Sequence, residues 1–590
     1  MRGVKRNRFS PLHDHDFLIT RQKKYRKVTG FSTDDSFMML RSGIGFSREI
    51  SPSLKTANAV RPSLEDWIKQ FISAAANGTF RLIKTLLKLC VPVVNSGPID
   101  SNTLIQAAAE GGQIEVVKYL KEQGADVNAG TTGYYTPIRS AAANGHLEVV
   151  KYLKEQGADI NAGTTGYNTP IRAAAANGHL EMVKYLKEQG ADVNAGTTGD
   201  GTPISAAAVF GHLEVVKYLI EQGADINAGT PIWGAAIGGH LEVVKYLKEQ
   251  GADVNAGSSD YDTSISAAAA NGYLEVVKYL KEQGTDVNRG FMGSYTPIYG
   301  AAKGGHLKVV KYLKEQGADV NAGDVGSGTP IYGAAEGGHL EVVKYLKEKR
   351  ADVNAGDVGS NTPIYGAAKG GHLEVVKYLK EQGADVNADT RGYETPIWVA
   401  AKNGYLEVVK YLKEQGADVN ANATGFQTPI RAAAVKGHLE VVKYLKERGA
   451  DVNAGITGSD TPICGAVTGG HLEVLKYLIE QGADVNAGTR GYETPIWWAA
   501  VKGHLEVVKY LKEKGADVNA GITGDKTPIW MAAARGHFGV VKYLLDNGGK
   551  ESDIGEHYER YANWFFLNNL KLQEICKKFI KREFGKEKIQ

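Results

Sequence analysis

A segment of 33 residues repeats along most of the chain, and this repeat constrains the fold more than any other feature. One copy begins at Thr136 and the next at Thr169. Further copies begin at Thr202, Thr230, Thr263, Thr296, Thr329, Thr362, Thr395, Thr428, Thr461, Thr494 and Thr527, and a copy without the proline begins at Thr103. A period of about 20–50 residues is typical of arrays of one supersecondary unit. Because such a unit cannot bury its apolar face alone, the chain is predicted to form one elongated array.

Each copy begins with residues that predict a short helix. Thr136 and Pro137 fit an N-cap and a first helical position, because the hydroxyl can accept a hydrogen bond from a free backbone N–H and proline lacks an N–H that would have no partner there. Ile138 and the alanines that follow form an apolar face that another helix can approach closely. Gly145 is predicted to end this helix in a tight turn.

A second helix is predicted over about residues 146–156, because apolar residues recur there at helical spacing. The apolar residues are Leu147, Val150 and Leu153. Gly157 fits the position after the helix end, where a left-handed conformation is common. The polar residues 159–168 are predicted to form a loop or hairpin that projects to one side of the array.

The pattern Thr-Pro-Ile-x-x-Ala-Ala-x-x-Gly-His-Leu-Glu-Val-Val, followed by Leu and then Gly-Ala-Asp-Val-Asn-Ala, resembles the ankyrin repeat over roughly residues 103–549. The resemblance implies an all-α solenoid, with about 14 repeats over residues 101–550 and a β-hairpin loop in each helix–turn–helix repeat. It also implies that hairpin tips and first helices line a concave face that binds proteins, without catalysis and without a cofactor. The copy at Thr230 lacks five loop residues, and we expect its helices to stack as elsewhere.

The segments outside the array differ in composition. Residues 1–66 are basic and lack periodicity, which predicts a disordered N-terminal tail, with residues 23–27 as an alternative patch for nuclear import or an acidic partner. Residues 67–100 carry a divergent copy, as expected of a terminal repeat that caps the stack. Residues 551–590 are predicted to form a C-terminal helical segment.

Within that last segment, apolar residues at i, i+4 and i+8 would form one narrow stripe on a helix. They are Leu572, Cys576 and Ile580. The stripe is similar to the elongin-binding box that opens a SOCS box, which ends the ankyrin arrays of a family of ubiquitin-ligase substrate receptors. This resemblance implies elongin B and C and a cullin as partners. A plain capping helix with the same spacing is the alternative.

The global composition bounds the function classes. Lys and Arg number 69 against 66 for Asp and Glu, so no overall excess of positive charge favours nucleic acid. A nucleic-acid-associated adaptor stays as an alternative, because basic residues alternate with aromatic ones in the repeats. The 3 cysteines lie far apart, which predicts free thiols in a reducing compartment. With no apolar run of about 18 residues and no secretion signal, we expect a monomer in the cytoplasm or nucleus without membrane contact.

No residues predict catalysis or a metal site. The sequence contains no phosphate-binding Gly-x-x-x-x-Gly-Lys, no His-Glu-x-x-His and no Cys-x-x-Cys. A histidine precedes the second helix of most copies, as His146 does. Because these histidines are spread one per repeat, they are too far apart to share a metal. A structural role is therefore predicted for them.

Variation between copies indicates where a partner could bind. Core positions scarcely change, whereas the hairpin tips, the third residue after each Thr and the ends of the first helices vary. The ends include Phe210, Lys303, Glu336, Lys369, Lys402, Lys436, Lys502 and Arg535. Aromatic residues and arginine dominate binding energy at interfaces. The predicted concave-face anchors at the third position are Arg139, Arg172, Trp233, Tyr299, Tyr332, Tyr365, Trp398, Arg431, Trp497 and Trp530. The alternative is that these side chains only pack against the next repeat.

Overall fold

The computed structural model describes fourteen stretches of the chain. They are residues 72–78, 101–130, 136–163, 168–196, 201–259, 262–289, 296–323, 328–356, 362–388, 394–421, 428–455, 460–488, 493–520 and 527–557. The chain divides into two units, Met1–Trp67 and Ile68–Gln590, and every described residue belongs to the second. The tail predicted over residues 1–66 and the stripe at residues 572–580 therefore lie outside the described residues.

Two kinds of helix alternate through the described residues. The first helices of the repeats are α5 (Ser101–Glu110), α7 (Pro137–Ala143), α9 (Pro170–Ala176), α11 (Pro203–Val209), α13 (Pro231–Gly238), α15 (Ser264–Ala270), α17 (Pro297–Lys303), α19 (Pro330–Glu336), α21 (Pro363–Gly370), α23 (Pro396–Asn403), α25 (Pro429–Lys436), α27 (Pro462–Gly469), α29 (Pro495–Lys502) and α31 (Pro528–Ala534). The second helices are α6 (Ile114–Glu122), α8 (Leu147–Glu155), α10 (Leu180–Glu188), α12 (Leu213–Glu221), α14 (Leu241–Glu249), α16 (Leu274–Glu282), α18 (Leu307–Glu315), α20 (Leu340–Glu348), α22 (Leu373–Glu381), α24 (Leu406–Glu414), α26 (Leu439–Glu447), α28 (Leu472–Glu480), α30 (Leu505–Glu513) and α32 (Phe538–Asp546).

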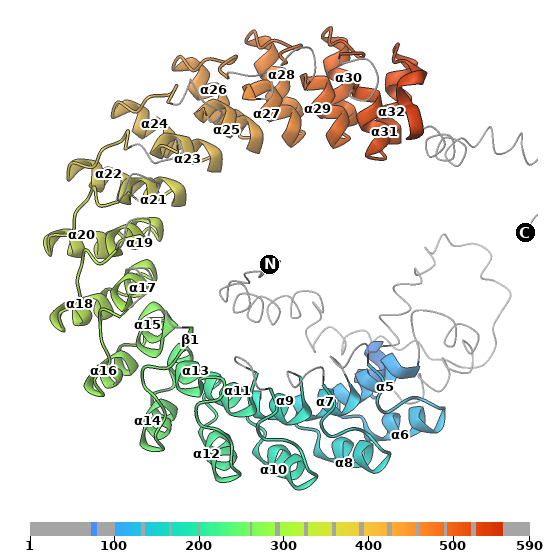
Figure 1. The fold of residues 1–590 in the computed structure, drawn as a ribbon, viewed down its shortest axis with the longest axis vertical. Helices are drawn as coiled ribbons and strands as arrows, with labels where there is room; N and C mark the ends of the chain where they lie inside the picture. The colour runs from blue at the N-terminus through green and yellow to red at the C-terminus, as the bar shows by residue number, and fades with distance from the viewer. Residues whose placement is uncertain are drawn as a thin grey trace, which may run out of the picture. The chain divides into compact units, whose positions relative to one another are not determined.

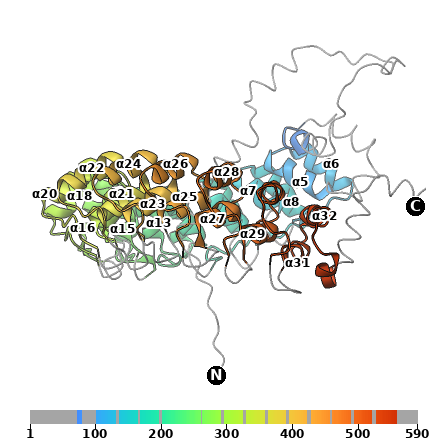
Figure 2. The same ribbon diagram turned by 90° about the horizontal axis from the view of Figure 1, so that it is seen from above.

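The helices of the array form two layers around one continuous apolar core. The odd-numbered helices form the inner layer and the even-numbered helices the outer layer (Figure 1). Figure 2 shows the same stack turned by 90°. The core is built from the same positions in every repeat, for example Ile138, Val150 and Leu153, all fully buried. Burying one such side chain contributes about 1.5–3 kcal/mol, so stacking between repeats supplies the stability that a single helix pair lacks. No helix in the described stretches has the length and apolar character needed to span a bilayer.

Local geometry confirms the predicted helix starts and stops. The Oγ of Thr136 accepts a hydrogen bond from the backbone N–H of Arg139 at 3.4 Å, and Pro137 occupies the first helical position. Gly145 adopts a φ of 75° at the turn between the helices, and Gly157 a φ of 88° after the second helix. Both φ values lie in the left-handed region, which favours glycine.

Polar side chains connect each repeat to the next. The predicted structural role of the histidines is confirmed, because the Nε2 of each array histidine that precedes a second helix lies 3.0–3.4 Å from a backbone oxygen of the preceding repeat. Asn128 makes a second connection: its Nδ2 donates to the oxygen of Gly157, and its Oδ1 accepts from the backbone N–H of Asp159. Equivalent asparagines repeat this bridge through most of the described array, so polar bonds as well as apolar contacts fix the stacking.

The shortened repeat keeps its place in the stack but loses its helix cap. Thr230 adopts a left-handed φ of 48°, and its side chain makes no cap hydrogen bond. The preceding repeat still contacts the short loop, because Thr202 donates to the oxygen of Ala228 and Ser205 to that of Gly229. The described residues contain one strand pair, β1 (Gly257–Ser259) antiparallel to β2 (Asp262–Thr263), in the loop of the next repeat.

The two ends of the described array are covered by short segments. Residues 72–76 are helical, and Ala75 is fully buried with the core. At the other end the 3-10 helix η3 (Glu551–His557) packs on α31, with Ile554 fully buried. The ring of His557 lies 5.3 Å from that of Trp530. Residues 551–557 therefore close the apolar core.

Candidate protein-binding surface

The outer and inner layers differ in how much their sequences vary between repeats. Most outer helices have the same sequence, Leu-Glu-Val-Val-Lys-Tyr-Leu-Lys-Glu, as in α8, α14, α16 and α20. Most inner helices keep the start Pro-Ile and then diverge, for example to Trp-Val-Ala-Ala-Lys-Asn in α23 and Tyr-Gly-Ala-Ala-Glu in α19. The outer layer shows that one helix sequence can stack many times, so stacking by itself does not require the inner helices to differ.

The ten predicted anchors fall into two groups by exposure. Four are buried, with 7% or less of their surface exposed: Trp233, Tyr332, Tyr365 and Trp398. The other six are half-buried: Arg139, Arg172, Tyr299, Arg431, Trp497 and Trp530. The four buried side chains pack within the free chain, which agrees with the alternative of packing against the next repeat. Only the second group presents substantial surface to a partner.

Neighbouring repeats explain the burial. The ring of Tyr332 lies over Gly366 of the next repeat, where an added Cβ would come within 3.0 Å of the ring. The ring of Tyr299 lies in the same way over Gly333, at 3.1 Å from an added Cβ. A glycine one residue further along in the next repeat therefore makes room for the aromatic side chain. Both residues of each pair can be read from the sequence, but their contact depends on how one repeat stacks on the next.

Two of the predicted anchors, Tyr332 and Tyr365, come together at a hollow on the inner layer, between α19, α21 and α23. The hollow has a volume of about 300 Å³. Its lining combines aromatic, cationic and acidic side chains: Tyr332, Tyr365, Lys369, Glu394, Val399, Lys402 and Asn403. The importance of Val399 and Asn403 was missed by the sequence analysis, because neither residue type nor spacing distinguishes them. Their neighbours in space belong to other repeats.

An ion network crosses three repeats beside this hollow. The carboxylate of Glu336 forms ion pairs with Lys369 at 2.7 Å and with Lys303 at 3.1 Å. One carboxylate on α19 therefore connects α17 and α21. Burial alone would raise the pKa of Glu336, but the hydrogen bond from Lys369 and the charge of Lys303 outweigh it. The pKa of Glu336 is therefore lowered below its ordinary value. Glu336 stays ionised at neutral pH and fixes the two lysines.

The tyrosines of the hollow are held in their neutral form. Burial and the charge of Glu336 raise the pKa of Tyr332, whose hydroxyl donates to that carboxylate at 3.3 Å. Burial and a hydrogen bond to Glu394 raise the pKa of Tyr365, with 2.7 Å between the two oxygens. Both hydroxyls act as hydrogen-bond donors and cannot serve as bases at neutral pH. The hollow thus presents hydrogen-bond donors and charged groups beside one another.

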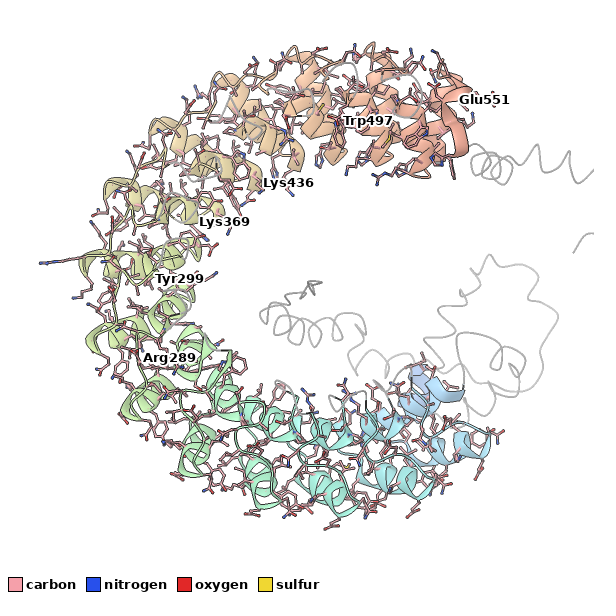
Figure 3. All side chains as sticks on the ribbon, viewed as in Figure 1. Arg289, Tyr299, Lys369, Lys436, Trp497 and Glu551 are labelled. Atoms are coloured by element: carbon pink, nitrogen blue, oxygen red, sulfur yellow. The ribbon has the colours of Figure 1, made fainter. Side chains whose placement is uncertain are left out.

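The cations of the inner layer remain accessible. The side chains of Lys303 and Lys369 are 52% and 47% exposed, and Lys369 and Lys436 project from the inner layer (Figure 3). The Nζ of Lys402 lies 4.5 Å from the ring centroid of Trp398, a cation–π contact that orients the ammonium group. Residues that both vary between repeats and are accessible therefore lie more at the ends of the inner helices than at the third residue after each threonine.

One large apolar side chain is also exposed on this layer. Phe210, at the end of α11, is 47% exposed, more than any other large hydrophobic side chain of the described residues. An exposed aromatic ring offers a partner apolar area without loss of core packing. Among the described residues there is no group of three or more His, Cys, Asp and Glu side chains that could hold a metal ion.

Comparison with known proteins places this architecture in a family. The family model described as ankyrin repeats in three copies matches residues 71–164, 162–230, 227–291, 290–357, 356–423, 422–489 and 463–556. The chain belongs to the ankyrin-repeat family. Ankyrin repeats are protein-interaction modules, so the chain is a protein-binding scaffold.

Single relatives add little to the family assignment. The solved structure of the human ASB11 ankyrin repeat domain matches with 29% sequence identity and a TM-score of 0.35, covering 38% of this chain and 99% of that domain. No curated protein matches the chain.

Proposed function

We propose that this ankyrin-repeat protein binds an extended segment of its partner along the inner layer, from α7 to α31. The observation that supports the proposal is the contrast between the layers: near-identical outer helices beside inner helices whose accessible ends differ from repeat to repeat. Residues that stacking does not constrain are free to be adapted to a partner. The half-buried aromatic and arginine side chains supply the residue types that dominate binding energy.

Chemical footprinting of the complex tests this location. The protein would be purified with its partner, treated with an acetylating reagent and compared with the free chain. Lysines on the inner layer, such as Lys303, Lys369 and Lys436, are expected to react more slowly in the complex. Lys344 and Lys443 of the outer layer serve as matched controls, because they lie in the same array at about 40% exposure. Protection confined to the outer lysines would contradict the proposal.

We propose, as a second candidate, that the chain delivers its partner to a ubiquitin ligase. The support is the spacing of Leu572, Cys576 and Ile580, which resembles an elongin-binding box. A stripe of this kind on a helix suits a groove of a partner protein. Elongin B and C should then co-purify with the chain from a eukaryotic lysate, and the double variant Leu572→Ala, Cys576→Ala should lose both. Absence of both from the purified wild-type chain would exclude the ligase role.

A further inference from the structure

The ends of the inner helices change character along the array. From α7 to α15 the residues at or just after the helix end are uncharged: Asn144, Asn177, Phe210, Gly238 and Asn271. From α17 onward most equivalent positions, seven or eight residues after the threonine of the repeat, are basic. We call these residues the cationic row: Lys303, Lys369, Lys402, Lys436, Lys502 and Arg535. At the ends of the inner helices, positive charge is therefore confined to the second half of the described array.

Much of this charge is not neutralised by the residues that the structure describes. On the outer layer most repeats contain an ion pair between a lysine and the glutamate three residues before it, as in Lys410 with Glu407 at 2.7 Å. On the inner layer Glu336 pairs with both Lys303 and Lys369, which leaves one net positive charge on these three side chains. Among the described residues no carboxylate lies within ion-pair distance of the remaining row members, which are Lys402, Lys436, Lys502 and Arg535. The last three side chains are exposed and Lys402 is half-exposed, so a solvent-borne anion can reach them.

We propose that the cationic row from α21 to α31 binds an acidic, extended segment of a partner protein. This inference rests on the proposed function, which places the partner on the inner layer. Neighbouring packed helices lie about 8–10 Å apart. Three residues of an extended or polyproline II segment span about 9–10 Å. A segment with a carboxylate at about every third residue therefore matches the spacing of Lys369, Lys402 and Lys436 on α21, α23 and α25.

The same surface is poorly suited to nucleic acid. A phosphate backbone would pass Glu336 and Glu394 at the hollow, and repulsion by these carboxylates would oppose it. Single-stranded nucleic acids also bind by stacking their bases on exposed aromatic rings. The aromatic rings that line the hollow belong to Tyr332 and Tyr365, and each is 6% exposed or less. A peptide does not need exposed aromatic rings for stacking. Its carboxylates can also be spaced so that they avoid Glu336 and Glu394.

Binding of a defined acidic peptide to the full-length chain tests the proposal. The probe is a fluorescent peptide of repeated Glu-Pro-Pro units, its control is the same peptide with Gln in place of Glu, and the readout is fluorescence anisotropy. We expect saturable binding of the Glu peptide that weakens as salt is raised. The triple variant Lys402→Glu, Lys436→Glu, Lys502→Glu should bind at least about tenfold more weakly. A matched variant, Lys410→Glu, Lys443→Glu, Lys509→Glu, reverses the same number of charges on the outer layer and should bind like the wild type.

Several outcomes would overturn the proposal. Equal losses in the inner and outer variants, with circular dichroism showing that both fold, would mean that only net charge matters. Binding of oligothymidine in preference to the Glu peptide would mark the row as a nucleic-acid surface. Absence of peptide binding together with inner-layer protection by the natural partner would refute the acidic ligand while leaving the proposed function intact. Protection of the outer layer alone would refute the proposed function itself.

Discussion

At the scale of single residues, Glu336 connects three inner helices through its side chain. It joins Lys303 and Lys369 and accepts a hydrogen bond from Tyr332, and its side chain is only 18% exposed. Replacement by glutamine keeps the shape but removes the charge. We expect Glu336→Gln to lower the free energy of unfolding by about 1–2 kcal/mol at pH 7, measured by urea denaturation. The control is Glu341→Gln on α20, whose carboxylate is 71% exposed and whose removal should cost less than about 0.5 kcal/mol.

The pH dependence of the Glu336 effect follows from its lowered pKa. A carboxyl group whose pKa is lowered by folding stabilises the fold above its unfolded pKa of about 4.3, and this contribution is lost as the pH falls through the folded value. The difference in stability between the wild type and Glu336→Gln should therefore be full at pH 6–7 and shrink below about pH 4. A difference that grows on acidification would show that the carboxylate does not stabilise the network.

Residue-level sequence reasoning predicted features that depend on neighbours along the chain and failed to decide those that depend on neighbours in space. The cap by Thr136 and the turn at Gly145 follow from a few consecutive residues. Whether an aromatic residue such as Tyr332 is buried depends on Gly366, which lies 34 residues further on. Exposure of a helix end likewise depends on the size of side chains in adjacent repeats. The fold was therefore predictable, whereas the hollow between α19 and α23 was not.

At the scale of the helix, the residue that follows each second helix in a left-handed conformation determines how favourably that helix ends. Nearly every repeat has glycine there, as Gly383 does with a φ of 90°. After α20 the position is Arg350, which adopts a φ of 70°. A left-handed conformation costs a residue with a Cβ about 1–2 kcal/mol. We expect Arg350→Gly to raise the free energy of unfolding by about 1 kcal/mol and Gly383→Arg to lower it by a similar amount, both measured by urea denaturation. Opposite signs would contradict the argument.

The threonine caps provide a matched pair at the same scale. The Oγ of Thr395 accepts from the backbone N–H of Trp398 at 3.3 Å, whereas the buried hydroxyl of Thr362 makes no cap hydrogen bond to α21. Thr395→Ala should therefore lower the unfolding free energy by about 1 kcal/mol. Thr362→Ala should cost clearly less, because its hydroxyl is already without a partner. Thermal denaturation of both variants under the same conditions compares them, and equal losses would show that the hydrogen bond contributes nothing.

At the scale of the whole molecule, stability should depend on which repeats become neighbours. Deletion of residues 296–328 removes α17 and α18 and places Ser266 opposite Gly333. In the wild type Ser266 lies opposite Gly300, so the residues at the new junction are equally small. Deletion of residues 461–493 removes α27 and α28 but brings Arg431 to Trp498 in place of Gly465. Both remove 33 residues. The first variant should fold with native helix content, and the second should be less stable by about 1–3 kcal/mol because its new junction is overpacked.

Circular dichroism and urea denaturation of the two deletion variants measure this difference. The wild-type chain and a variant lacking residues 329–361 provide the reference for loss of one repeat. In that variant Tyr299 lies opposite Gly366, so a tyrosine faces a glycine as it does in the wild type. Indistinguishable stabilities for all three variants would mean that the third position does not govern the fit between repeats.

The hydrogen bonds between repeats connect only immediate neighbours, so they do not fix how many repeats the array contains. His146 reaches Glu110 and Asn128 reaches Gly157, and the corresponding bonds elsewhere also extend by one repeat. Duplication or loss of a 33-residue coding unit thus lengthens or shortens the molecule in fixed steps without redesign of the remainder. In such a molecule, the length of the binding surface is itself a property that can be inherited and changed. The lineage can adjust how long a ligand it accommodates separately from the chemistry with which each step recognises it.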